Sequence, residues 1–355
     1  MRIEDYALVG DCHSAALIGR DGSIDWLCWP RFDSCACFAA LLGRPEHGRW
    51  RIAPSGKYSV LRKYRTDTLI LETTFECAEG AATLIDFMPM RDQHCNLVRI
   101  VAGTRGRVAF DMEFILRFDY GASVPWVTKL EEAEGGNAGI RAIAGPDMAA
   151  LRSPVPLHGK GLSTVARFEV GEGERRAFVL SHGASHLEVP PAIDAEAALE
   201  RTEKFWRDWS GRCQTGGEWS GAVRRSLITL KALTYAPTGG IVAAPTTSLP
   251  EMIGSVRNWD YRYCWLRDAT ITLLALMNGG YTEEAGCWRD WLARAIAGSP
   301  QQLQIMYGIG GERRLPEAIL SWLPGYEGSA PVRVGNAAAG QLQLDVYGEV
   351  MDALH

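Results

Sequence analysis

The stretch "SVRNWDYRYCWLRDATITLLALM", Ser255–Met277, places tryptophans and tyrosines beside arginines and aspartates. Aromatic rings stack on the apolar faces of sugars, while guanidinium and carboxylate groups bind hydroxyls. We therefore interpret Tyr261 and Trp265 as candidate walls, and Arg267 and Asp268 as candidate hydroxyl ligands, of a carbohydrate site. The alternative is structural, because Asp268 precedes the apolar run "ATITLLALM" and could cap that helix.

A second polar cluster lies in "GYEGSAPVRVGNAAAGQLQLDVYGEV". Arg333 and Asn336 fall in its loop portion. A helix is expected from Gln341 onwards, and Gln341, Asp345 and Glu349, spaced four apart, would then share one face. Taken alone, this trio is explained better by a solvated helix face than by catalysis.

Glycoside hydrolysis usually needs two carboxyl groups, one as acid and one as base or nucleophile. The candidates are Asp260, Asp268, Glu312, Glu317, Asp345 and Glu349, and no pair stands out among them. The sequence lacks a G-x-S-x-G elbow, a P-loop and an H-E-x-x-H motif, so esterase, NTPase and zincin functions have no motif to support them.

Composition narrows the class of protein. The chain is 47% hydrophobic and 22% charged, with a formal net charge of -5, so we expect a folded protein that binds neither nucleic acid nor membrane. The acidic start "MRIEDYALVG" and the absence of a long apolar run predict a cytoplasmic location. The nine cysteines are scattered, and Cys35 and Cys37 have no second cysteine pair or histidine nearby to complete a zinc site, so we expect reduced and mostly buried thiols.

The spacing of apolar residues changes along the chain. Short β-rich runs with turn signals such as Asp21-Gly22 continue to about Val189 and predict an antiparallel sandwich. Helical spacing follows at Ala195–Trp209 within a linker, residues 190–217. Further helices are expected at 218–235, 269–277, 282–296 and 341–354, separated by two long loops of the length that functional loops have.

Three extended stretches together resemble glycoside hydrolase family 15, the bacterial glucoamylase-like and trehalase-like enzymes. They are "EDYALVGDCHSAALIGRDGSIDWLCWPRFDSCACFAALLG", "NWDYRYCWLRD" and "GYEGSAPVRVGNAAAGQLQLDVYGEV", in that order. At "CACF" we would expect a proline from the family pattern, and this difference concerns the local turn there. The resemblance implies a multidomain, all-β plus all-α chain: an antiparallel β-sandwich over 1–189, a helical linker over 190–217 and the first part of an (α/α)6 barrel over 218–355.

The resemblance also implies roles for residues. Tyr261, Trp265, Arg267 and Asp268 would hold the non-reducing glucose, with Arg333 and Asn336 in a second rim. It implies an inverting mechanism without cofactor or metal, in which a glutamic acid protonates the glycosidic oxygen and a glutamate activates water.

We expect the segments carrying these two glutamates to lie beyond His355, so the barrel would be incomplete. Its helices would then expose apolar faces, the chain would be inactive alone, and association into homo-oligomers stays open.

The resulting hypothesis is a hydrolase that releases glucose from an α-glucoside substrate, with trehalose, maltose and longer α-glucans left as alternatives. One rival is a compact enzyme that uses Glu312, Glu317, Asp345 or Glu349. The other rival is a carbohydrate-binding or structural β-sandwich protein with a helical tail.

Overall fold

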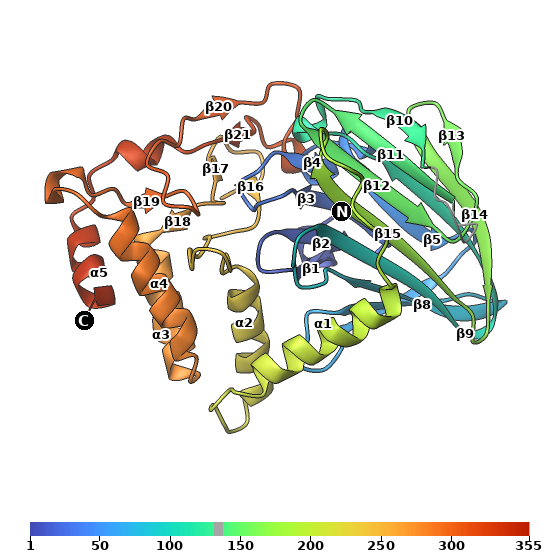
Figure 1. Cartoon of the computed structure of the whole chain (residues 1–355), viewed down its shortest axis with the longest axis horizontal. Coiled ribbons are helices and arrows are strands. Elements are labelled where there is room, and N and C mark those ends of the chain that lie inside the picture. The colour runs from blue at the N-terminus through green and yellow to red at the C-terminus, as the bar shows by residue number, and fades with distance from the viewer. Residues whose placement is uncertain (131–137, 355) are drawn as a thin grey trace. The chain divides into compact units, whose positions relative to one another are not determined.

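The structure, a computed structural model, describes residues 1–130 and 138–354 and divides into two compact units. Unit 1 comprises Met1–Asp11, Ala15–Pro30 and Ser34–Trp206, and unit 2 comprises Cys12–Ser14, Arg31–Asp33 and Arg207–His355. Unit 1 is built from strands and unit 2 mainly from helices and loops (Figure 1). The boundary between the units falls inside helix α1, Ala195–Ser210, between Trp206 and Arg207. This helix agrees within one residue with the helix predicted at Ala195–Trp209.

Unit 1 contains one antiparallel sheet of fifteen strands, whose main path runs β1-β2-β3-β5-β9-β15-β12-β11-β10. The strands are β1 Tyr6–Gly10, β2 Ala15–Gly19, β3 Ser23–Cys28, β4 Ala36–Phe38, β5 Arg49–Pro54, β6 Ser59–Tyr64, β7 Leu71–Glu76, β8 Gly80–Phe87, β9 Cys95–Ile115, β10 Trp126–Lys129, β11 Ala138–Ala144, β12 Asp147–Ser153, β13 His158–Lys160, β14 Ser163–Gly171 and β15 Arg175–Ala184. The predicted turn at Asp21-Gly22 is confirmed between β2 and β3, where Gly22 has a φ of 77°. A Cβ atom there would lie 2.2 Å from the Ile52 carbonyl oxygen, so only glycine fits.

Strand β9 joins the two parts of this sheet. Its first part pairs with β8 and β15, and its second part, from Arg107, pairs with β5 and β14. Strand β9 continues through Gly103 and Gly106, although Gly106 has a φ of 59°, and the register against β8 shifts between Ala81 and Ala82.

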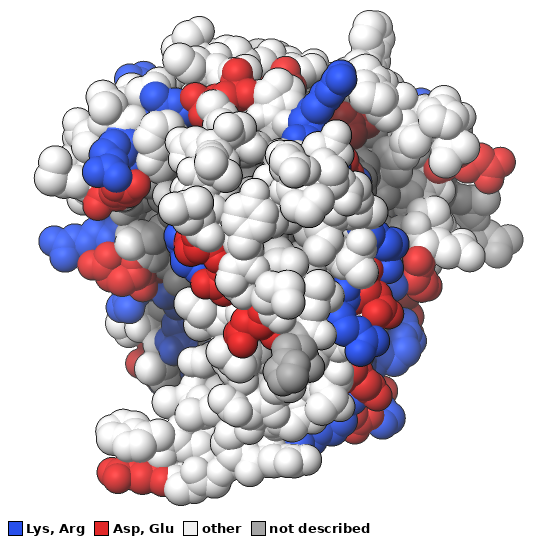
Figure 2. All heavy atoms as spheres, turned by 90° about the vertical axis from the view of Figure 1, so that its left-hand side faces the viewer, with Lys and Arg blue, Asp and Glu red and all other residues white. Residues whose placement is uncertain are grey.

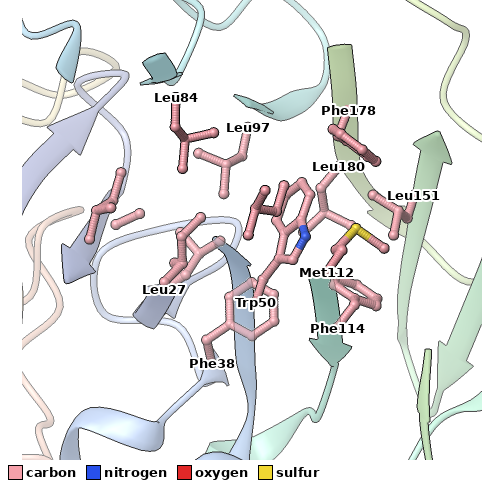
Figure 3. Close-up of a cluster of buried hydrophobic side chains, with 14 of the residues drawn as sticks. Leu27, Phe38, Trp50, Leu84, Leu97, Met112, Phe114, Leu151, Phe178 and Leu180 are labelled. Atoms are coloured by element: carbon pink, nitrogen blue, oxygen red, sulfur yellow. The ribbon is translucent and has the colours of Figure 1, made fainter. Parts of the chain in front are cut away.

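Alternation of side chains along the strands produces the core of unit 1. In β14, Ala166, Phe168 and Val170 are buried, while Arg167 and Glu169 between them are exposed. The buried side chains meet those of neighbouring strands in a large aromatic and aliphatic cluster (Figure 3). Trp50 and Phe114 lie at its centre, edge to face, with ring centroids 5.6 Å apart.

A second, smaller core lies on the other side of β8, β9 and β15. Ile85, Val98 and Val179 point to this side and pack against Ala198 and Leu199 of α1. Because both faces of these strands are covered, their sequences are apolar almost throughout and do not alternate.

Unit 2 contains α2 Ser220–Ala232, α3 Leu266–Asn278, α4 Thr282–Ala295 and α5 Asp345–Leu354, together with the last residues of α1. Helix α3 packs against α2, α4 and α5. The core includes Trp288 and Trp291 of α4, stacked with centroids 4.5 Å apart. Buried Glu284 accepts hydrogen bonds from Trp209 Nε1 at 2.6 Å and Lys231 Nζ at 3.0 Å, which ties α4 to α1 and α2.

The two segments predicted as long loops contain short paired strands. They are β16 Thr247–Pro250 with β17 Asn258–Asp260, β18 Cys264–Trp265 with β19 Met306–Tyr307, and β20 Ala318–Ile319 with β21 Arg333–Val334. A 3₁₀ turn, Ala337–Gly340, follows β21. These pairings fix loops that the sequence pattern left undefined.

Several surface properties bear on the expectations above. Among the described residues, no helix has the length and apolar character needed to cross a membrane. All nine cysteines are free and five of them are buried. Helix α3 exposes Ile271, Leu274 and Met277, and α5 exposes Met351. On the face seen in Figure 2, acidic and basic side chains lie interspersed among neutral ones.

Candidate active site

The paired loops of unit 2 enclose a cavity of about 350 Å³. Its lining combines aromatic, amide and charged side chains: Arg257, Trp259, Tyr261, Trp265, Glu317, Asn336, Ala337, Ala338 and Gln341. Three of the six predicted site residues are therefore part of its wall, namely Tyr261, Trp265 and Asn336.

The aromatic wall comes from the segment between β17 and α3. Trp259 and Tyr261 are two residues apart on an extended backbone, so they face the same side, and both line the cavity. The Tyr261 and Trp265 rings lie 6.0 Å apart at 48° to each other. Burial raises the pKa of Tyr261, with smaller contributions from Glu251 and Asp268, so its hydroxyl stays protonated and able to donate.

A buried ion pair holds the opposite wall in place. Asp260 and Arg262 are 0% and 1% exposed and form two hydrogen bonds, of 2.9 and 2.7 Å. The same carboxylate accepts from the Gly335 backbone N–H at 3.1 Å, and the Asp260 carbonyl accepts from Asn336 Nδ2 at 2.9 Å. Asp260, a candidate catalytic carboxylate, is thus fully engaged within the protein and does not line the cavity.

Asn336 is itself 3% exposed, and its Oδ1 accepts from the Ala338 N–H at 3.0 Å. This contact caps the 3₁₀ turn that supplies Ala337 and Ala338 to the wall. The Asn336 side chain therefore holds the shape of this loop, and it also lines the cavity.

Arg333 contacts the aromatic wall without lining the cavity. Its guanidinium lies 4.7 Å from the centre of the Trp259 ring, and its Nη1 donates to the carbonyl oxygens of Val256 at 3.0 Å and Asn258 at 3.2 Å. Its Nε lies 3.2 Å from Glu317 Oε1, an ion pair without hydrogen-bond geometry. The side chain is 14% exposed and is absent from the cavity lining, which differs from the rim position that the resemblance implied.

Arg267 and Asp268 lie beside the cavity without lining it. Their side chains are 48% and 47% exposed, with Arg267 Nη2 3.7 Å from Asp268 Oδ2. Arg267 Nη1 lies 3.5 Å from Asp345 Oδ2, and its guanidinium is 6.0 Å from the centre of the Trp265 ring. The pair is accessible and unobstructed by strong internal hydrogen bonds.

The suggestion that Asp268 caps the helix is wrong. Helix α3 begins at Leu266, Trp265 occupies the cap position, and Asp268 lies inside the first turn. A carboxylate in that turn is favoured by the helix dipole. The sequence missed this because the helix starts with the aromatic segment and not with the apolar run after it.

The polar face proposed for Gln341, Asp345 and Glu349 is also wrong in part. Helix α5 begins at Asp345, so Gln341 lies before it, on an extended backbone, and lines the cavity. Asp345 pairs with Arg267, and Glu349 does not line the cavity.

The Glu312 carboxylate is engaged in contacts within the protein: Oε1 accepts from Arg31 Nη2 at 2.9 Å and Oε2 from the Gly310 N–H at 2.9 Å. Burial opposes its ionisation, but these hydrogen bonds hold the pKa of Glu312 below its ordinary value. Of the candidate carboxylates, Glu317 lines the cavity, and it accepts from the Ala337 N–H at 3.2 Å. Over residues 1–130 and 138–354, no cluster of three or more His, Cys, Asp or Glu could hold a metal ion.

Trp259 and Arg257 are lining residues that the sequence analysis did not select. The sequence did contain a signal for Trp259, because Trp259 and Tyr261 alternate with Asn258 and Asp260. Predicting a strand over these residues would have placed the two rings on one side, and the structure buries Asn258 and Asp260 on the other.

Comparison with known proteins places these features in a family. Residues 1–206 match the family described as trehalase-like, N-terminal, and residues 218–355 match glycosyl hydrolases family 15. The trehalase of Mycolicibacterium smegmatis is 35% identical over 99% of this chain and 56% of its own length. The trehalase of Thermoplasma volcanium is 31% identical over 100% of this chain and 57% of its own length. The chain therefore spans a little over half the length of these relatives.

A bacterial glucoamylase solved in complex with acarbose has a similar fold, with a TM-score of 0.63 and 13% sequence identity. The match covers 88% of this chain and 52% of that structure. The two family matches make the chain a member of glycosyl hydrolase family 15 that carries a trehalase-like N-terminal region.

Proposed function

We propose that this protein takes part in hydrolysis of an α-glucoside and that the aromatic cavity of unit 2 binds the non-reducing glucose. The observation that carries the proposal is the wall formed by Trp259, Tyr261 and Trp265 with the accessible Arg267–Asp268 pair beside it. Rings of this kind bind the apolar faces of a pyranose, while the ion pair can exchange its mutual contact for contacts with vicinal hydroxyls.

The relatives named trehalase make trehalose the first substrate to test, followed by maltose and longer α-glucans. We further propose that the chain folds as a β-sandwich over 1–189, a helical linker over 190–217 and the first part of an (α/α)6 barrel over 218–355. The glucoamylase-like fold supports this description.

The mechanism we propose is inversion. It requires a glutamic acid and a glutamate on opposite sides of the bond, roughly 6.5–9.5 Å apart, with water between base and sugar. Glu317 is the one acidic residue in the described lining. Its carboxylate already pairs with Arg333 and accepts a hydrogen bond from the Ala337 N–H. We therefore assign neither catalytic role to a residue of this chain and propose that residues outside 1–355 supply both.

Calorimetric titration with trehalose and maltose tests the binding part of the proposal independently of turnover. Saturable heat is expected, and Trp265→Ala should remove it, because the ring is a wall of the cavity. Trp219→Ala is the matched control, since Trp219 is 71% exposed and lies outside the cavity. Equal binding by both variants would mean that the sugar does not bind at this wall.

A further inference from the structure

Three arginines are buried among the described residues, and they differ in whether a carboxylate lies beside the guanidinium. Arg99, 0% exposed, hydrogen bonds to Asp86 at 2.7 Å, and Arg262, 1% exposed, to Asp260 at 2.7 Å. Arg117, 6% exposed, has no carboxylate partner in the described part of the chain. A buried cation normally has a counter-charge, because desolvating it alone is costly.

The guanidinium of Arg117 is nevertheless fixed in place. Its Nη1 donates to the Leu116 carbonyl oxygen at 2.6 Å and its Nη2 to the Leu162 carbonyl oxygen at 3.1 Å. These two contacts use two of the five N–H groups of the guanidinium, and a carbonyl oxygen carries no formal charge that could neutralise its positive charge. Burial accordingly lowers the pKa of Arg117, with no opposing contribution from a neighbouring carboxylate.

This arginine lines a cavity of about 320 Å³ in unit 1, between the end of β9, strands β10 and β11, and the β13–β14 hairpin. It is the one charged residue in the described lining. Phe114 and Ile140, both buried, form part of the inner wall, and Val127 and Leu162, 46% and 70% exposed, lie at the solvent side. The cavity therefore offers one fixed positive charge within mostly apolar walls.

We propose that this cavity is a binding site for an organic monocarboxylate with an apolar body. The carboxylate would accept from the remaining N–H groups of Arg117 and supply the missing counter-charge, while the walls would bury the apolar part. The site lies in unit 1 and is independent of the proposed sugar site.

Calorimetric titration of the 355-residue protein with three probes tests each part of the proposal. Benzoate should bind saturably, and added salt should weaken the binding. Benzamide keeps the ring without the charge, and acetate keeps the charge without the ring, so each should bind at least about tenfold more weakly than benzoate. An absence of saturable benzoate binding, or equal binding of benzamide, would refute the proposal.

Two variants locate the site. Arg117→Met should lose benzoate binding by about tenfold or more, and it should raise the thermal stability of the ligand-free protein, because an unpaired buried charge is removed. Should that variant fail to fold, Leu162→Asp repels the anion from an exposed wall position, and Leu187→Asp, at a 62% exposed residue outside the cavity, is its control. Unchanged binding in Leu162→Asp would exclude this cavity as the site.

A last variant covers the residues outside the described ranges. Replacing Glu131, Glu132 and Glu134 together by Gln should leave benzoate binding unchanged. If benzoate binds only after this replacement, a carboxylate of the chain itself is the counter-charge of Arg117, and the proposal is wrong.

Discussion

The guanidinium of Arg333 lies 4.7 Å from the centre of the Trp259 ring while it donates to the carbonyl oxygens of Val256 and Asn258. One side chain thus holds the backbone on both sides of Arg257 and presses against the ring that lines the cavity. Arg333 therefore determines where the aromatic wall stands, although it does not reach the cavity itself.

Arg333→Lys should weaken sugar binding by about tenfold, because an ammonium cannot stack on the ring and donate in two fixed directions. Calorimetric titration with trehalose measures the effect. The control is Arg289→Lys, in an exposed pair with Asp290 on α4, which should bind as the unchanged protein does. Equal affinity of the Arg333→Lys protein would show that the wall does not depend on this arginine.

Asp268→Ala should reduce sugar affinity by about tenfold or more while changing the free energy of unfolding by less than about 1 kcal/mol. The reason is that the Asp268 carboxylate is about half exposed, at 47%, and its pairing with Arg267 is a surface contact. Titration and urea unfolding of the same sample separate the two effects. Asp290→Ala is the surface control, and unchanged affinity after Asp268→Ala would place Asp268 outside the site.

Asp260→Asn should lower the free energy of unfolding by about 3–5 kcal/mol, because it removes the buried carboxylate that forms two hydrogen bonds with the buried Arg262 guanidinium. Asp345→Asn breaks the exposed pair with Arg267 and should cost about 0.5 kcal/mol or less. Urea unfolding monitored by tryptophan fluorescence measures both. Similar values for the two variants would contradict the structural role assigned to the buried pair.

The stability of unit 2 should fall in acid through Glu284. Burial opposes ionisation, but Lys231 and Trp209 hold the pKa of Glu284 below its ordinary value. The unfolded chain therefore takes up a proton first, so this contribution is complete above the unfolded pKa, about 4.3, and is lost as pH falls through the lower folded value.

Urea unfolding between pH 7 and pH 3 should show this loss, and Glu284→Gln should flatten the curve. Glu283→Gln should leave the curve unchanged, since that neighbouring side chain is 78% exposed. A parallel acid loss in the Glu284→Gln protein would assign the effect to other carboxylates.

Residues 1–355 alone should release no glucose from trehalose, maltose or soluble starch, because inversion needs two carboxyl groups and one lines the described cavity. Glucose release over hours at high protein concentration is the measurement. Release that vanishes in Glu317→Gln or Glu349→Gln would favour the compact-enzyme alternative.

The sequence by itself determined the succession of elements. Alternation of apolar residues in segments such as β14 and helical spacing at Ala195–Trp209 are local signals, and the structure contains a strand and a helix there. The sequence also picked out Tyr261, Trp265 and Asn336, which line one cavity, because their side-chain types suit a sugar and cluster in two short segments.

The tertiary structure alone decided how these residues are used. From the sequence, Arg333 was a candidate for the rim of the site and Asp260 a candidate catalytic carboxylate. Arg333 instead packs against Trp259 of a distant loop, and Asp260 pairs with Arg262 and accepts from the Gly335 N–H of a distant loop, so neither lines the cavity. Likewise, nothing local distinguishes Arg117 from Arg99. Only the long-range pairing of strands places Asp86 beside Arg99 and leaves Arg117 facing a cavity, since a counter-charge depends on position in space and not on spacing along the chain.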